Sequence, residues 1–286
     1  MMIRSATVAV LFACAAAGAA AQSLDGPESI EFHPRSGRYF IGNTGGGILQ
    51  RAPDGTLSTF TDAPASPYGI ELLGGVLYAL DSGHLKGYDV DSAEPVLDLA
   101  IDGASFLNGI TSDGAHTLYL SDFGAKKIHR VDVADLAAPV QSELTPTAQT
   151  PNGLVYDRAG NRLLVATWTG NAKILEIPLD GSPTPATLIQ TQLGSIDGIA
   201  LDCAGRIFVA AWSCDNGGCL ARFDPPFASD PPTAAAEVIA DGLSGPADID
   251  YNRIGGEIAV PQSNADAIGF HATGCEAAAF ADDFER

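Results

Sequence analysis

The chain has 286 residues and carries 35 Asp and Glu against 15 Lys and Arg, which gives a formal net charge of −20. This excess of negative charge argues against nucleic acids and anionic membrane surfaces as partners, because both attract Lys and Arg. A chain of this length can bury one sizeable core, and all-β domains of this size are commonly single.

The N-terminal segment has the features of an export signal. Arg4 gives a short positive start, an apolar run covers 6–13, and Ala19-Ala20-Ala21 offers small residues for cleavage. The apolar run is too short for a comfortable membrane span. We therefore expect residues 1–21 to be a signal peptide. The mature protein should be periplasmic or secreted, with no membrane contact beyond export.

A short phrase recurs six times in the rest of the chain. It consists of a residue that is usually polar, then a small residue, then Ile or Leu at the start of an expected strand. The copies are Glu28-Ser29-Ile30, Tyr68-Gly69-Ile70, Asn108-Gly109-Ile110, Asn152-Gly153-Leu154, Asp197-Gly198-Ile199 and Ala247-Asp248-Ile249. Their apolar members are 40, 40, 44, 45 and 50 residues apart. A period near this length, with several strands in each unit, is typical of a propeller.

Each repeat contains the same order of elements. The phrase opens a first strand, a turn containing Gly or Asp follows, and a run of β-branched and aromatic residues forms a second strand. The second strands are expected at 39–41, 76–78, 118–120, 163–165, 207–209 and 258–260. Third and weaker fourth strands follow, as at 127–132 and 95–99. No stretch has a convincing helical period.

These repeats predict an all-β fold, a six-bladed β-propeller with four antiparallel strands per blade. It should occupy 22–276, with a C-terminal tail at 277–286, and we expect a monomer. Few residues precede the first phrase, so an N-terminal strand is not expected to complete the last blade. Residues 277–281 are the alternative source of its outer strand.

The first position of the phrase, called the slot here, is a candidate metal site. The innermost strands of a propeller begin on one face around the axis, so the six slots should converge. The slots with oxygen donors are Glu28, Asn108, Asn152 and Asp197, and the other two are Tyr68 and Ala247. Each slot lies two residues before the apolar member, so regular alternation would place both on one strand face.

Two carboxylates and two amide oxygens suit a hard divalent cation, and Ca²⁺ is the preferred choice. Mg²⁺ and Mn²⁺ are alternatives, and Zn²⁺ more usually takes His or Cys ligands. A simpler interpretation is that the Asn-Gly and Asp-Gly pairs are ordinary turns.

Aromatic residues are expected to border the same mouth. Phe123, Trp168 and Trp212 fall at equivalent ends of second strands. Such rings either pack between blades or form an apolar collar for the carbon skeleton of a ligand. Asp248, one position after the last slot, could support the cation or contact a substrate. The candidates for contact with a small-molecule substrate are Tyr68, Phe106, Trp168, Trp212 and Asp248.

Four cysteines remain after the signal segment, and an even count in an exported chain favours disulfides. Cys214 and Cys219 share one short loop with two glycines, so we expect them to pair. Cys203 and Cys275 should both lie on the opposite face of the propeller and form the second bond. The alternative is a metal-binding or reduced pair.

Several segments resemble a known superfamily. They are Gly26-Pro27-Glu28-Ser29-Ile30, Pro151-Asn152-Gly153-Leu154, and Asp197-Gly198-Ile199-Ala200-Leu201-Asp202 with Gly205. Over 25–275 the chain resembles the superfamily of senescence marker protein (regucalcin), gluconolactonase and strictosidine synthase. The resemblance implies a six-bladed propeller with a divalent metal at the axis. It implies Glu28, Asn152 and Asp197 as ligands, with Asn108 touching substrate or metal. It also implies hydrolysis of lactones or related esters, with Asp197 as proton acceptor.

Two departures from that pattern bear on the substrate. Sugar-lactone members have an Arg shortly before the Asn of the third blade, where this chain reads Ser105-Phe106-Leu107-Asn108. The paraoxonases have a His where this chain has Tyr68. An apolar lactone or ester is therefore at least as well supported as a sugar lactone. The alternative function is a non-catalytic propeller that binds a small molecule, glycan or protein partner.

Overall fold

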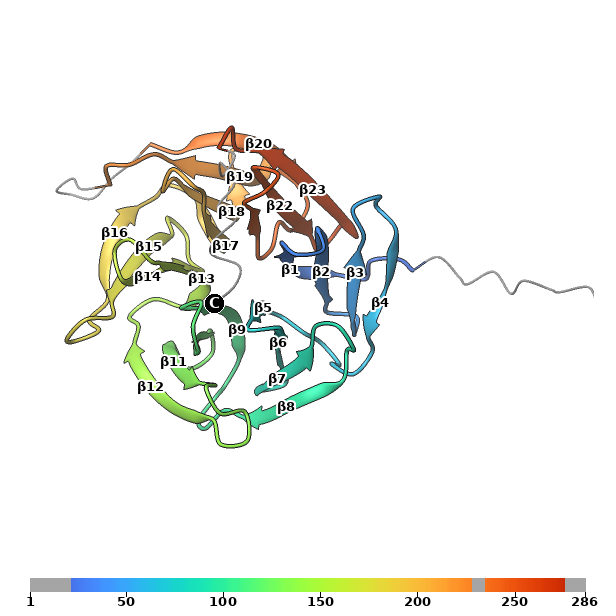
Figure 1. The fold of residues 1–286 in the computed structure, drawn as a ribbon. Coiled ribbons are helices and arrows are strands. Elements are labelled where there is room, and N and C mark those ends of the chain that lie inside the picture. Colours follow the sequence, from blue (N-terminus) through green and yellow to red (C-terminus); the bar gives the residue numbers. More distant parts are fainter. Residues whose placement is uncertain (1–21, 228–234, 276–286) are drawn as a thin grey trace, which may run out of the picture.

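The computed structural model describes residues 22–227 and 235–275. Within these ranges, 23 strands form six antiparallel sheets arranged as blades around a central axis (Figure 1). In the same ranges no helix is long and apolar enough to cross a membrane. The predicted six-bladed β-propeller is confirmed.

The first three blades each contain four strands, with the innermost strand first in sequence. Blade 1 contains β1 (Pro27–His33), β2 (Arg38–Asn43), β3 (Ile48–Arg51) and β4 (Leu57–Thr61). Blade 2 contains β5 (Ile70–Leu73), β6 (Val76–Asp81), β7 (His84–Asp89) and β8 (Pro95–Ala100). Blade 3 contains β9 (Leu107–Ser112), β10 (Thr117–Asp122), β11 (Lys127–Asp132) and β12 (Val140–Pro146).

The next two blades follow the same order, and the last is shorter. Blade 4 contains β13 (Pro151–Asp157), β14 (Arg162–Thr167), β15 (Lys173–Pro178) and β16 (Ala186–Gln190). Blade 5 contains β17 (Gly194–Leu201), β18 (Ile207–Cys214), β19 (Gly217–Phe223) and β20 (Glu237–Leu243). Blade 6 contains β21 (Asp250–Asn252), β22 (Glu257–Gln262) and β23 (Ala267–Ala272).

Blade 6 thus has three strands in the described part of the chain, one fewer than expected. The segment 277–281, considered as its fourth strand, lies outside the described residues. Side-chain and backbone bonds join the first and last blades. The Asp248 N–H donates to the Glu28 carbonyl at 2.9 Å, and the Tyr39 hydroxyl donates to Glu257 Oε1 at 2.8 Å. The ring therefore closes through polar contacts between blades 6 and 1.

The apolar member of the phrase forms the core between blades. Ile30, Ile70, Ile110, Leu154, Ile199 and Ile249 are each at most 6% exposed. Each belongs to a different apolar cluster, and each cluster joins two adjacent blades. Burying such a side chain stabilises a fold by roughly 1.5–3 kcal/mol. One position per repeat therefore packs all six blade interfaces.

The small member of the phrase is required by close contact between inner strands. A Cβ on Gly69, Gly109, Gly153 or Gly198 would lie 2.5–2.6 Å from the carbonyl oxygen of the slot residue in the next blade. Real Cβ atoms do not approach an oxygen so closely, so only glycine fits without moving the strands. The glycines that suggested turns thus allow the inner strands to approach one another around the axis.

Regular strand alternation does not hold at the phrase. The ladder register shifts between Pro27 and Ser29, between Pro151 and Leu154, and between Ile196 and Ile199. Such irregularities re-aim side chains and are common beside functional sites. The expectation that slot and apolar member share one strand face is therefore wrong. The apolar member enters the core between blades, while slot residues from different blades interact with one another.

Candidate functional site

Three carboxylates from three blades share one environment close to the axis. We call Glu28, Asp197 and Asp248 the upper acids. Burial raises the pKa of Glu28 to about 9, and the charges of Asp197 and Asp248 add to the effect. Burial, followed by the charge of Asp197, raises the pKa of Asp248 well above its usual range. None of the ion pairs in the described part of the chain includes an upper acid. The site therefore gathers three acids without a protein counter-charge among the described residues, and the raised pKa values of Glu28 and Asp248 favour their protonated forms.

Asp197 is held by two side chains and is 3% exposed. The Trp212 indole N–H donates to Asp197 Oδ2 at 2.8 Å. Burial raises the pKa of Asp197 to about 7, while hydrogen bonds from Trp212 and Asn152 act in the opposite direction. Both donors favour the ionised carboxylate, so they partly offset the cost of burying it.

Asn152 presents a buried acceptor without a partner. The residue is 1% exposed, and its amide nitrogen faces Asp197 as a donor. Its Oδ1 has no hydrogen-bond partner. A buried polar atom left unpaired costs about 1–3 kcal/mol. An oxygen in this state beside a carboxylate is suited to a bound cation or a ligand donor.

The other sequence-predicted ligand, Asn108, lies on the inner strand of blade 3, beside that of blade 4. It is 8% exposed, and its carbonyl oxygen lies against Gly69. The structure thus groups Glu28, Asp197 and Asp248 by charge and Asn152 by its hydrogen bond. Asn108 holds the equivalent position on blade 3 and, within the described residues, forms no hydrogen bond with these acids. Ala247, in the sixth slot, is fully buried.

Five aromatic rings form a continuous row across blades 2 to 5, which we call the aromatic arc. The centroid distances are 4.8 Å for Tyr68–Phe106, 5.5 Å for Phe106–Phe123, 6.2 Å for Phe123–Trp168 and 5.4 Å for Trp168–Trp212. All four contacts are edge-to-face, a favourable geometry for aromatic pairs. Each residue remains partly exposed. The arc is therefore an accessible apolar surface, and its last ring bonds directly to Asp197.

Aspartates at the ends of second strands support the loops that lead to two slots. Asp122 accepts N–H bonds from Ser105 at 2.9 Å and Phe106 at 3.0 Å. Asp81 accepts N–H bonds from Ala65 and Ser66 at 3.1 Å. Sequence reasoning missed these residues. The recurrence of Asp at the end of the second strand in repeats 2 and 3 was the available signal.

A second group of acids was also missed, three residues after the slots of blades 1, 2 and 6. We call Glu31, Glu71 and Asp250 the lower acids. The Leu72 N–H donates to Glu31 Oε1 at 3.3 Å, and the Phe32 N–H donates to Asp250 Oδ2 at 2.7 Å. Glu71 forms the corresponding bond with the backbone of Ser112. Each lower acid thus links its inner strand to the inner strand of an adjacent blade.

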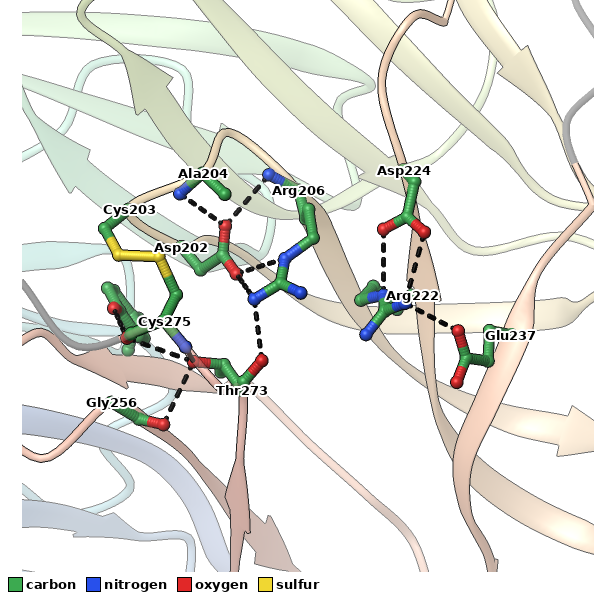
Figure 2. A network of polar contacts seen from close by, with 11 residues as sticks. Asp202, Cys203, Ala204, Arg206, Arg222, Asp224, Glu237, Gly256, Thr273 and Cys275 are labelled. Carbon is green, nitrogen blue, oxygen red and sulfur yellow. Dashed lines mark hydrogen bonds and ion pairs between the residues drawn. A yellow bond between two sulfur atoms is a disulfide. The ribbon is translucent and has the colours of Figure 1, made fainter.

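Both expected disulfides are present. Cys214–Cys219 closes the turn between β18 and β19, directly after Trp212. Cys203–Cys275 joins a blade 5 turn to the residues after β23. Figure 2 shows this bond beside Arg206, whose guanidinium donates to Asp202 Oδ2 at 2.6 Å and to the Thr273 carbonyl at 2.7 Å. Disulfides are consistent with an extracellular protein. The expected signal peptide lies outside the described residues.

The donor set is compatible with a divalent cation only if amide oxygens take part. In 22–227 and 235–275, no group of three or more His, Cys, Asp or Glu side chains has the arrangement of a metal centre. The orphaned Asn152 Oδ1 and the uncompensated carboxylates supply oxygen ligands of the kind that Ca²⁺ prefers. Glu28, Asn152 and Asp197, with Asn108 on the neighbouring strand, are thus the residues that could hold such an ion.

A separate cleft of about 1340 Å³ lies away from these carboxylates, along blades 4 and 5. Its lining is rich in amides and hydroxyls, including Gln149, Asn171, Gln190, Thr191 and Asn216. The upper acids do not line it. The upper acids, and not the cleft, combine buried acids with the unpaired Asn152 Oδ1.

No protein-family model matches the chain, and no curated protein matches it in sequence. Solved structures do match. A gluconolactonase from Xanthomonas campestris is 13% identical, with a TM-score of 0.68 over 87% of this chain and 86% of that one. A protein of unknown function from Bacteroides thetaiotaomicron is 14% identical, with a TM-score of 0.69 over 88% and 70%. A chain of a nidogen/laminin complex is 16% identical, with a TM-score of 0.63 over 82% and 93%. At these identities the likeness shows the propeller fold alone.

Proposed function

We propose that this protein is an exported, metal-dependent hydrolase of lactones or related esters. The observation that carries the proposal is the orphaned Asn152 Oδ1 beside the uncompensated upper acids. The structural likeness to a gluconolactonase is compatible with this function. Glu28, Asn108, Asn152 and Asp197 would hold the cation, with Ca²⁺ the ion best suited to these oxygen ligands and Mg²⁺, Mn²⁺ or Zn²⁺ the alternatives.

A bound divalent cation supplies Lewis-acid chemistry, polarising a carbonyl oxygen and lowering the pKa of a bound water. Side chains of the protein accept and return the proton of the attacking water. Asp197 accepts it from the attacking water as the water oxygen bonds to the carbonyl carbon. The carbon–oxygen bond of the ester then breaks, and the leaving alkoxide takes the proton from Asp197, which returns to its carboxylate form. The Trp212 and Asn152 donors keep Asp197 oriented during this exchange.

The aromatic arc sets the expected substrate class. Tyr68, Phe106, Trp168 and Trp212 give a partly exposed apolar surface beside the acids. Asp248 adds an acid without a protein counter-charge, so the site offers no cation among the described residues to bind an acidic substrate. A neutral lactone or ester with an apolar carbon skeleton fits this combination better than a charged one.

The decisive experiment measures hydrolysis of a panel of apolar and sugar lactones after the metal is stripped and Ca²⁺, Mg²⁺, Mn²⁺ or Zn²⁺ is restored. The wild type should lose activity with chelator and regain it with one of these ions. Asp197→Ala should be inactive, whereas Asp180→Ala, in an exposed turn, should match the wild type. Equal activity in wild type and Asp197→Ala would contradict the proposal.

A second candidate is a non-catalytic propeller that binds a small molecule, glycan or protein partner. The amide-rich cleft along blades 4 and 5 favours it, because amide and hydroxyl groups can bond to a polar ligand. No hydrolysis across the lactone panel, together with glycan binding that Gln190→Ala abolishes, would support this candidate over the first.

A further inference from the structure

We propose that Trp212 is a positioning residue, which fixes the Asp197 carboxylate for cation binding through its indole N–H. This inference rests on the proposed function, because it concerns the cation that Asp197 would hold. It gives Trp212 a role different from that of the other rings of the aromatic arc, which would contact the substrate.

The geometry of Asp197 shows why a positioning donor matters. The terminal torsion of an Asp side chain is broad, so a carboxylate without donors can rotate. Trp212 Nε1 lies 2.8 Å from Asp197 Oδ2, and the Asn152 amide forms a second hydrogen bond to this carboxylate. Hydrogen bonds to ionised acceptors are roughly twice as strong as neutral ones. Two such donors fix the plane of the carboxylate and the lone pairs that remain for a cation.

Trp212 is itself held in place on both sides. Its ring makes an edge-to-face contact with Trp168, with centroids 5.4 Å apart. Two residues later, Cys214 forms a disulfide with Cys219, which pairs with Ala211 across the hairpin. Ser213 lies opposite Gly194 in the ladder of β17 and β18. The end of β18 that carries Trp212 is therefore held in place, which fixes the position of the indole N–H.

The chain contains a matched control for this role. Trp168 is the only other tryptophan, and it lies beside Trp212 in the same arc. In the described part of the chain, its indole makes ring contacts and no side-chain hydrogen bond. If both residues acted only by packing, replacing either ring with Phe would affect cation binding alike. A positioning role predicts that only Trp212 matters.

The test measures Ca²⁺ affinity by titration calorimetry with CaCl₂, independently of catalysis. Trp212→Phe should weaken binding about 10- to 100-fold, the usual effect of removing a group that orients a metal ligand. Trp168→Phe should bind Ca²⁺ as the wild type does. Trp212→His, which retains a ring N–H, should recover part of the loss. Melting curves establish that each variant is folded.

Tryptophan fluorescence provides a second readout that does not require the Trp212→Phe variant to fold. In Trp168→Phe, Trp212 is the sole tryptophan, so addition of Ca²⁺ should change its emission. Wild-type affinity in Trp212→Phe, or unchanged emission while calorimetry records binding to Trp168→Phe, would overturn the positioning role. If the wild type binds none of Ca²⁺, Mg²⁺, Mn²⁺ and Zn²⁺, the result would instead refute the metal-dependent function on which the positioning role of Trp212 rests.

Discussion

The upper acids, on blades 1, 5 and 6, and the lower acids, on blades 1, 2 and 6, all lie at the inner strands, yet their surroundings differ. Each lower acid accepts a backbone N–H from an adjacent blade, as the Phe32 N–H bond to Asp250 illustrates. Among the described residues no upper acid accepts a backbone N–H from an adjacent blade, although the Ile249 N–H bonds to Asp248 within blade 6. Asp197 is held by side chains alone, and Glu28 interacts with Asp197 and Asp248 through repulsion.

Charge separates the two groups further. Burial raises the pKa of Glu31, Glu71 and Asp250, and the charge of Arg253 acts in the opposite direction on all three, which partly compensates the lower acids. The upper acids have no such cation among their influences. A buried acid that bonds to the backbone of an adjacent blade serves the fold, whereas one that lacks both such a bond and a nearby cation remains available to a ligand. Four predictions test this distinction.

The largest effect should come from removing one upper acid. Asp197→Ala should lower lactone hydrolysis by about 100-fold or more, because it removes both a cation ligand and the proton acceptor. Asp250→Asn, which keeps an oxygen acceptor for the Phe32 N–H, should retain most of the activity. Initial rates at saturating Ca²⁺ measure both. An equal loss of lactone hydrolysis in both variants would contradict the proposed difference between upper and lower acids.

Chelation should destabilise the wild type but not a protein that lacks the upper site. A ligand at 100 times its Kd stabilises a folded protein by about 2.7 kcal/mol. EDTA should therefore lower the melting temperature of the wild type, and Asp197→Ala should melt at the same temperature with and without EDTA. An EDTA effect that persists in Asp197→Ala would assign the cation to another site.

A bond between blades can be tested without altering a charge. On blade 3, Thr111 Oγ1 takes the place of a lower acid and accepts the Tyr156 N–H at 3.3 Å. Thr111→Val should lower the free energy of unfolding by about 1–3 kcal/mol, since the N–H loses its partner. Thr184→Val, at an exposed loop position, is the control. Urea denaturation provides the measurement, and equal stability of the two variants would contradict the role.

The smallest expected effect is a change in how the free energy of unfolding depends on pH, caused by one lower acid, Glu71. Burial raises the pKa of Glu71 to about 8 from its usual 4.5, although the Ser112 bonds lower it. The folded state therefore retains a proton that the unfolded state has lost. The contribution of Glu71 to the free energy of unfolding is therefore complete below about pH 4.5 and is lost as the pH rises through about 8. Glu71→Gln should remove the part of the pH dependence that comes from Glu71, as measured by urea denaturation at a series of pH values between about 4.5 and 8. Parallel profiles for variant and wild type would refute it.

The sequence pointed to one group of acids at the axis and missed another. The repeated phrase identified Glu28, Asn152 and Asp197, which the structure brings close together. The lower acids also recur at a fixed place, three residues after a slot. Glu31 and Glu71 lie in strands, however, where an acid usually indicates an exposed face. Their bonds to adjacent blades depend on how the inner strands pack, and local pattern does not report that packing.

The sequence by itself determined the number of blades and the pairing of the cysteines. The blade count and the Cys214–Cys219 pair follow from local signals, because each repeat carries its own strand and turn residues and these two cysteines share one loop. The Cys203–Cys275 pair, 72 residues apart, followed from placing both cysteines on one face of the predicted propeller. Only the tertiary structure decided which acids are compensated and that Trp212 on β18 bonds to Asp197 on the neighbouring strand β17. Close approach of the inner strands requires glycine and shifts the ladder register. These two effects break the alternation from which side-chain direction is predicted, so the contacts at the axis depended on the assembled ring.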